Sequence, residues 1–173
     1  VPAVGAPHLY RSRVVWDYSA ENVRALRALG LERVVHCPLG YVPSMTRIQR
    51  FGVEPVDAFF YGAMNARRRD LLDSVAQAGV GLIASEWAWG EARDDLIARS
   101  KMVLNFHYHE PAIFEIFRCS HLFASARCVV SEGGSVDPEL EALAHRCAVV
   151  VPKDEVAQTC LELRADPSRC REL

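Results

Sequence analysis

The sequence lacks features that would place it in several large classes of protein. It contains no apolar run of 18 residues, so no segment is expected to span a membrane. Lys and Arg number 20 against 22 Asp and Glu, and this formal charge of -2 lacks the basic excess of most nucleic-acid binders. We therefore expect no nucleic-acid partner and at most peripheral contact with a membrane.

Several enzyme and metal-site motifs are also missing. No two cysteines have the C-x2-C spacing of zinc sites, and neither a G-x-G-x-x-G fingerprint nor a G-x-S-x-G nucleophile elbow is present. Some of the six cysteines sit inside apolar runs, where a thiol behaves as a small hydrophobic side chain. We expect them to be reduced and structural, as in a cytoplasmic protein.

Length and composition fit a globular protein of modest size. With 173 residues, 50% of them hydrophobic and 24% charged, the chain matches one domain, or one domain plus part of another. The sequence shows no signal peptide and starts at Val1 rather than Met, which fits a fragment of a longer protein as well as a whole one.

From residue 56 onward, apolar runs alternate regularly with amphipathic segments. The predicted strands cover residues 56–61, 80–84, 102–105, 128–131 and 147–151. The predicted helices cover residues 65–78 and 90–99, a segment that opens at Pro111, and residues 138–144 and 154–164. This alternation predicts an α/β fold with a doubly wound parallel sheet of the Rossmann-like type.

A shorter version of the pattern precedes it. We expect a strand at residues 14–17, a helix from Ser19 or Ala20 to a stop at Gly30, and a strand at residues 31–37. The segment before them should be irregular, and a loose stretch should follow to Glu54. This β-α-β unit could open the main domain or belong to a separate one, and the residues themselves are compatible with both arrangements.

Polar side chains follow the ends of two neighbouring buried strands. Asn105, His107 and Tyr108 come at the end of one strand, and Glu132 ends the next. In a parallel sheet covered on both faces, ligands bind in the crevice at the carboxyl ends of the strands. A helix that opens at Pro111 would add free N–H groups there, which attract anions. The pattern predicts a ligand site at this edge.

A second candidate site lies in FYGAMNARRRD, residues 60–70. Gly62 would let a ligand approach the backbone, and Asn65 can cap the following helix. Arg67 and Arg68 are suited to bidentate phosphate contacts. The alternative is that Asn65 is a plain N-cap and the arginines form a solvated helix face.

The pattern VLNFHYHE…FEIFRCSHLFAS…VVSE, at residues 103–110, 114–125 and 129–132, carries a resemblance. It resembles the nucleotide-sugar-binding half of bacterial glycosyltransferases with two facing Rossmann-like domains, the GT-B architecture. Its nearest likeness is to glycosyltransferase family 1 proteins of capsule and lipopolysaccharide loci. That superfamily has a Glu-x7-Glu pair, but His121 stands at the place of the second Glu, and Glu115 and Arg118 look like the substitutes.

The resemblance implies an enzyme that transfers a sugar from a nucleotide diphosphate sugar to a glycan or lipid-linked acceptor in polysaccharide biosynthesis. Residues 51–173 would be the donor-binding domain, and residues 1–50 the end of the acceptor-side domain with the crossing between domains. No cofactor and no metal would be needed, and the location would be cytoplasmic. The catalytic base would lie on the acceptor-side domain. The donor-binding residues implied are Gly62, Asn65, Arg67, His107, Tyr108, Glu115, Arg118 and Glu132.

These implied roles compete with plainer ones. Glu115 and Arg118 lie three apart on one helical face, where a carboxylate could accept ribose hydroxyls and a cation could stabilise a diphosphate leaving group. Such pairs are also common as purely structural contacts of a few tenths of a kcal/mol. Glu132 could line the pocket or serve as a cap.

The imidazole and indole groups near these sites allow more than one role. His107, His109 and Glu110 suggest a metal site, because alternate residues of an extended segment share a face and the two imidazoles could converge, but no further ligand with metal-site spacing follows. Trp87 and Trp89 could stack on a base or sugar, or belong to a lid or core. The alternative function for the whole chain is a Rossmann-like nucleotide-binding or regulatory domain without transfer chemistry.

Overall fold

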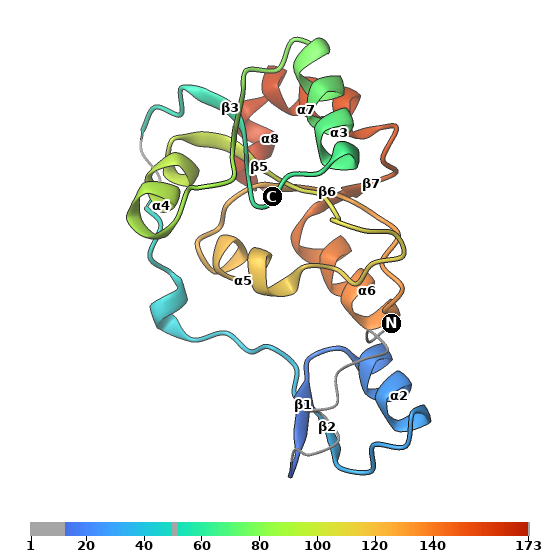
Figure 1. Cartoon of the computed structure of the whole chain (residues 1–173). Coiled ribbons are helices and arrows are strands. Elements are labelled where there is room, and N and C mark those ends of the chain that lie inside the picture. Colours follow the sequence, from blue (N-terminus) through green and yellow to red (C-terminus); the bar gives the residue numbers. More distant parts are fainter. Residues whose placement is uncertain (1–12, 50–51, 173) are drawn as a thin grey trace.

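The computed structural model describes residues 13–49 and 52–172. Its main body is a five-stranded parallel sheet with the strand order β4-β3-β5-β6-β7 (Figure 1). The strands are β3 (Val56–Tyr61), β4 (Leu82–Ser85), β5 (Ser100–Asn105), β6 (Val129–Glu132) and β7 (Val149–Val151). The predicted α/β fold with a doubly wound, Rossmann-like sheet is confirmed.

Helices cover both faces of this sheet. One face packs against α3 (Ala66–Gln77), α7 (Val156–Ala165) and α8 (Pro167–Glu172), and the other against α4 (Gly90–Ala98), α5 (Ile116–Ala124) and α6 (Pro138–Cys147). The short α8 was not expected from the sequence. In the described part of the chain, no helix combines the length and apolar character needed to cross a membrane.

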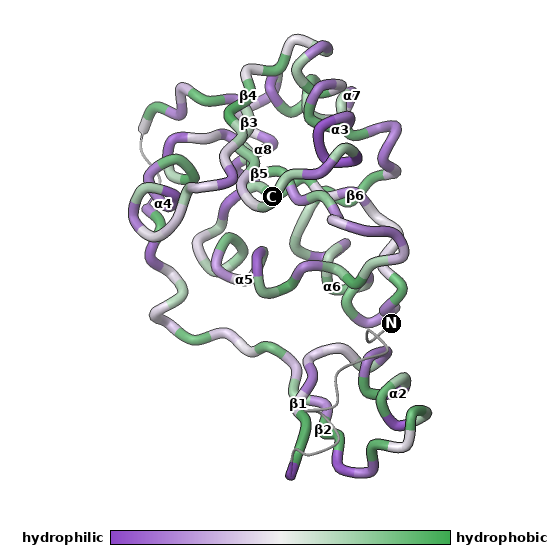
Figure 2. The backbone as a smooth tube through the Cα atoms, viewed as in Figure 1, coloured by the Kyte–Doolittle hydropathy of each residue, from purple (hydrophilic) through white to green (hydrophobic). Residues whose placement is uncertain are grey.

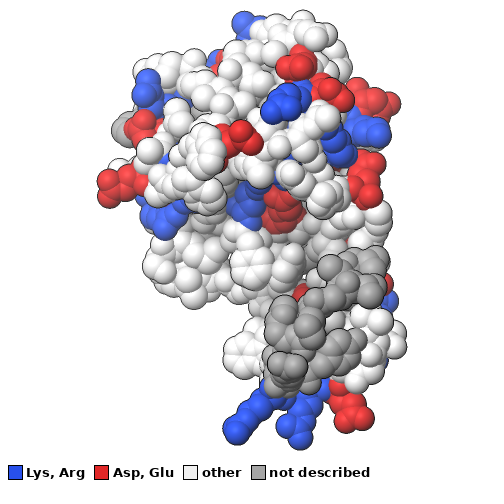
Figure 3. All heavy atoms as spheres, in the orientation of Figure 1, with Lys and Arg blue, Asp and Glu red and all other residues white. Residues whose placement is uncertain are grey.

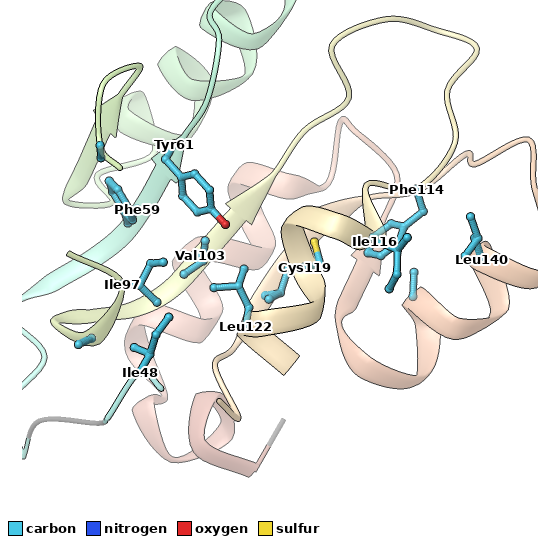
Figure 4. Close-up of a cluster of buried hydrophobic side chains, with 14 residues drawn as sticks. Ile48, Phe59, Tyr61, Ile97, Val103, Phe114, Ile116, Cys119, Leu122 and Leu140 are labelled. Atoms are coloured by element: carbon cyan, nitrogen blue, oxygen red, sulfur yellow. The ribbon is translucent and has the colours of Figure 1, made fainter. Parts of the chain in front are cut away.

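The central strands are apolar on both sides because both sides are buried. Successive side chains of a strand point to opposite faces, so Phe59 and Tyr61 join the cluster under α4 and α5, while Phe60 joins the cluster under α3. Figure 4 shows the first cluster, where Phe59 and Val103 face Leu122 of α5. Full burial of each Phe side chain stabilises the fold by about 1.5–3 kcal/mol.

Many charged side chains lie on the outer surface of this three-layer arrangement, although some, such as Arg68, are buried. The first turn of α3 carries three arginines and is purple in the hydropathy view (Figure 2). On the face shown in Figure 3, acidic and basic side chains are interspersed rather than gathered by sign. This face therefore presents no broad basic surface of the kind that binds nucleic acid.

The prediction of a helix that opens at Pro111 was wrong, because α5 begins only at Ile116. The residues before it are extended: Ala112 forms a β-bridge with Ser135, and the N–H of Phe114 donates to Ser135 Oγ at 3.0 Å. The Phe114 ring is fully buried. This burial and the pairing with the loop after β6 outweigh local helix propensity, so Pro111 does not begin a helix N-terminus.

Residues 15–36 form a smaller unit beside the main sheet. β1 (Val15–Asp17) and β2 (Val34–His36) pair in a two-stranded parallel sheet covered by α2 (Ala20–Ala28), at the bottom of Figure 1. From Cys37 a linker, described over residues 37–49 and 52–55, leads to the main body and contains the 3-10 turn η1 (Pro43–Met45). The Tyr18 ring contacts the Phe117 ring of α5 edge-on, with centroids 4.7 Å apart. The division into domains near residue 50 stays a prediction.

A single buried carboxylate joins the two units. Asp137 Oδ1 accepts the N–H groups of Glu139 and Leu140 at 3.0 and 3.1 Å, which caps α6. Its Oδ2 accepts the Ser19 hydroxyl at 2.5 Å and the Glu21 N–H at 3.2 Å, at the start of α2. Burial opposes the charge of Asp137, but these hydrogen bonds prevail and lower its pKa. Two helix N-termini thus share one anion.

We expect Asp137→Asn to loosen α2 more than α6. Asparagine keeps an oxygen that can cap α6, but its NH2 group then faces the N–H of Glu21. Stability should fall by about 1–3 kcal/mol in chemical denaturation. Hydrogen exchange should accelerate over residues 20–28 and stay unchanged over residues 66–77. Asp73→Asn, on the exposed side of α3, is the matched control. Equal exchange over residues 20–28 in both variants would contradict the shared cap.

Candidate functional site

The strand order reverses between β3 and β5. From β3 the chain moves outward to β4, then returns to form β5 on the other side of β3. In open α/β sheets the crevice outside the carboxyl ends of the strands at such a reversal is the usual ligand site. Tyr61 and Gly62 lie at this end of β3, and Asn105 lies at this end of β5.

A cavity of about 570 Å³ opens beside the reversal, on the side of α4 and α5. This volume falls in the range of about 300–1,000 Å³ that is typical of small-molecule sites. Its walls come from the end of β3, the start of α4, α5 and the linker. The lining residues are Ser44, Met45, Arg47, Tyr61, Gly62, Trp89, Arg93, Phe117, Arg118, Ser120 and His121.

Arg118 lies directly against the backbone at Gly62. Its Nη1 donates to the carbonyl of Tyr61 at 2.6 Å, and its Nε pairs with Glu115 Oε2 at 2.7 Å. A Cβ atom at residue 62 would overlap Arg118 Nη2, and the φ of +129° disfavours any other residue. Glycine at residue 62 therefore leaves room for this guanidinium to lie against the backbone. The predicted pair of Glu115 and Arg118 is present as an ion pair.

A second guanidinium holds Glu115 from the other side. Arg68 donates through Nη2 to Glu115 Oε1 at 2.7 Å, through Nε to the Phe106 carbonyl at 2.9 Å, and through Nη1 to the Ala63 carbonyl at 2.8 Å. Its side chain is almost fully buried. Arg68 thus joins the loops after β3 and β5 to the start of α5. No local pattern distinguishes it from its two arginine neighbours.

Arg67 belongs to a separate group of charges. Its Nη1 donates to Glu132 Oε1 at 2.7 Å and to the His107 carbonyl at 3.1 Å, and its Nη2 contacts both Glu110 and Glu132. The hydrogen bonds that Arg67 donates to these carboxylates raise its pKa, and the one to Glu132 contributes most. The buried Glu132 also accepts the N–H of His107. Arg67 is therefore engaged by protein groups.

The remaining predicted residues surround this network. Asn65 Oδ1 caps α3 by accepting the N–H of Arg68 at 2.9 Å, and its Nδ2 donates to the Tyr108 carbonyl at 2.6 Å. The Tyr108 ring lies 5.2 Å from the Arg68 guanidinium. His107 is buried, and neither ring nitrogen has a hydrogen-bond partner in residues 13–49 and 52–172. Burial lowers the pKa of His107, so its ring is neutral at pH 7.

All eight predicted residues gather at the carboxyl edge, but only two line the cavity. Gly62 and Arg118 do so, and the other six support or flank them. Arg47 and Arg93 also line it, although no motif in the sequence singles them out. Both pair with Asp94, at 2.9 Å from Arg47 Nε and 2.8 Å from Arg93 Nη2. The pairing of Arg47 with Asp94 is a tertiary contact between the linker and α4.

The three cavity arginines keep hydrogen-bond donors unused. A guanidinium carries five N–H donors, of which each of these side chains uses only some. Among the residues that the structure describes, Arg118 Nη2, Arg93 Nη1 and both Nη atoms of Arg47 have no partner. These donors can bind an anion without breaking an existing contact.

His121 adds a neutral imidazole to the cavity wall. Its Nε2 is buried and has no hydrogen-bond partner in the described segments. Burial is the main cause that lowers its pKa to about 4, and the nearby Arg93 contributes. At neutral pH the positive charge of the cavity therefore comes from arginine alone.

The two histidines of the loop after β5 lie in different environments. His107 is buried, whereas the exposed His109 packs edge-on against the Tyr108 ring with centroids 4.6 Å apart. Across residues 13–49 and 52–172, no group of three or more His, Cys, Asp or Glu side chains could hold a metal ion. A metal-independent site stays a prediction.

We expect Gly62→Ala to destabilise the protein by about 1–3 kcal/mol, because alanine is strained at this φ and its Cβ displaces Arg118. Thermal or urea unfolding of the purified variant measures the effect. Gly52→Ala is the control, since an added Cβ there meets no atom within 4 Å. A Gly62→Ala protein as stable as the control would contradict the close contact.

The stability of the chain should depend on His121 between pH 6.5 and 4. Its folded pKa of about 4 is below the unfolded value of 6.5, so the unfolded state binds the proton more readily in this range. The contribution of neutral His121 to the stability of the fold is complete above pH 6.5 and is lost as the pH falls towards 4. Relative to His121→Gln, the wild type should lose about 1 kcal/mol in urea unfolding from pH 7 to pH 4.5, after discounting for solvent screening. If the free energy of unfolding changed equally with pH in the wild type and in His121→Gln, the burial of His121 would be contradicted.

Comparison with known proteins yields viral relatives without an assigned activity. No protein-family model matches the chain. It is similar to uncharacterized protein L140 of Acanthamoeba polyphaga mimivirus, with 29% identity over 152 residues that cover 84% of this chain and 49% of the viral protein. It is also similar to uncharacterized protein L137 of that virus, with 33% identity over 122 residues that cover 67% of this chain and 16% of that protein. The chain thus spans about half the length of the first relative and less of the second.

Proposed function

We propose that the chain is the donor-binding part of a glycosyltransferase that moves a sugar from a nucleotide diphosphate sugar to a glycan or lipid-linked acceptor. The observation that carries the proposal is the cavity at the strand-order reversal, whose arginines have unused donors. The resemblance of residues 103–132 to GT-B glycosyltransferases supports the same assignment.

The charges of the cavity suit a diphosphate. Arg47, Arg93 and Arg118 bring three positive charges. Asp94 neutralises one of them, and Glu115, which pairs with Arg118, is shared with Arg68. Guanidinium groups bind phosphate oxygens through two parallel hydrogen bonds, each stronger than a neutral one. As the sugar departs, negative charge grows on the diphosphate, and fixed cations stabilise it. Arginines would then take the role that a divalent cation has in other transferases.

Arg118 is the best placed of the three for this role. Glu115 and the Tyr61 carbonyl fix its guanidinium, and Arg68 fixes Glu115 in turn. A side chain that is already ordered loses little entropy when a ligand binds. We therefore assign Glu115 a positioning role behind Arg118, because both of its carboxylate oxygens already accept from arginine.

Calorimetric titration with UDP, GDP, ADP and CMP, each without and with Mg²⁺, tests the proposal. We expect saturable binding of one nucleoside diphosphate without metal. Arg118→Ala should weaken that binding at least tenfold, because a charged hydrogen bond contributes about 1.5–3 kcal/mol. Circular dichroism verifies that each variant is folded.

Arg99→Ala is the matched control for this titration. Arg99 is the C-cap residue of α4, carries the same charge, is exposed and pairs only loosely with Asp95, at 3.6 Å. It lies outside the cavity lining and should leave the affinity unchanged. A folded wild type that binds none of the four nucleotides, or an Arg118→Ala variant with wild-type affinity, would refute the proposal.

A further inference from the structure

Two exposed tryptophans lie two positions apart in the loop between β4 and α4. Trp87 is 84% exposed and Trp89 is 70% exposed, although indole is among the largest apolar side chains. Only Trp89 lines the cavity. The structure thus excludes a core role for either ring, and it distinguishes between two residues that are equivalent by sequence pattern.

The loop that carries them is held to the body of the protein. Glu86 Oε1 accepts the N–H of Met64 at 2.6 Å, in the loop after β3. Ala88, between the two tryptophans, is buried in the cluster under α4 and α5. Trp89 is the N-cap residue of α4, and its carbonyl accepts the N–H of Arg93. The backbone of the loop is therefore fixed while both rings face solvent.

The Trp89 ring is available for a ligand. In the described part of the chain no aromatic ring or guanidinium packs on it, whereas Phe117 of α5, which also lines the cavity, already contacts Tyr18. An exposed ring loses little when a planar ligand covers it, and base stacking on an aromatic side chain is strongly favourable.

We propose that Trp89 stacks on the base of the bound nucleotide, an inference that rests on the function proposed above. The base would lie at the start of α4, and the diphosphate would reach towards Arg118 of α5. Arg93, one turn after Trp89 on the same side of α4, would bridge the two parts. A flat stacking surface accepts any base, so Trp89 would supply affinity for nucleotides as a class.

Three probes of increasing size locate the contact. They are inorganic pyrophosphate, then whichever of UDP, GDP and ADP binds the wild type best, then the glucose ester of that nucleotide, all titrated by calorimetry into the whole chain. Trp89→Ala should weaken binding of the nucleoside diphosphate about five- to hundredfold and leave pyrophosphate affinity within about twofold. Trp89→Phe should restore most of the loss, because a phenyl ring still stacks.

Trp87→Ala is the matched control, since it removes the same side chain from the same loop but outside the cavity lining. In a Trp16→Phe, Trp87→Phe protein, Trp89 is the sole tryptophan, and its fluorescence should be quenched by the nucleoside diphosphate but not by pyrophosphate.

Each outcome decides the inference. A Trp89→Ala variant with the nucleoside diphosphate affinity of Trp87→Ala would overturn it while the proposed function stands. A loss confined to the glucose ester would assign Trp89 to the sugar and likewise overturn it. A folded wild type that binds none of the probes would overturn both proposals.

Discussion

Burial of the central strands on both faces constrains every other part of the molecule. β3 and β5 lie between two helical layers, so their interior positions must be apolar, and a charged group there would carry a large desolvation penalty. Polar side chains can gather only where the strands end. The reversal of strand order separates the crossing helices at the carboxyl edge, and the cavity lies there.

At this edge, many charged side chains form ion pairs with one another, and the groups that are paired in this way are not free to bind a ligand. Glu132 and Glu110 occupy Arg67, and Glu115 joins Arg68 to Arg118. Glu132 and Arg68 are buried, and a buried charge without a partner is costly, so each of them needs its ion pair. At the cavity, by contrast, Arg118, Arg93 and Arg47 keep donors on their Nη atoms, where solvent can supply the remaining hydrogen bonds. This difference separates arginines that support the site from those that can bind an anion.

Much of this arrangement follows from local sequence, and the exceptions have clear physical causes. Asn65 caps α3 as predicted, since its side chain reaches an N–H three residues away. Pro111 does not open a helix, because Phe114 is drawn into the core and Ala112 pairs with Ser135, distant in sequence. The site shows the same division. Glu115 and Arg118 could be paired from their spacing, whereas the contribution of Arg68 depends on a contact across 47 residues.

Local sequence accounts for most of the elements and for the fold class, because apolar periodicity and helix caps act over a few residues and are written in consecutive letters. It also accounts for the polar groups that end β5 and β6. Long-range contacts, in turn, set where α5 starts and which arginines keep free donors. They also bring Arg47 and Arg93 to Asp94, and they turn Trp89 rather than Trp87 towards the cavity. These outcomes depend on hydrogen bonds and ion pairs between residues that are distant in the sequence, and a local sequence pattern does not reveal which distant residues come into contact.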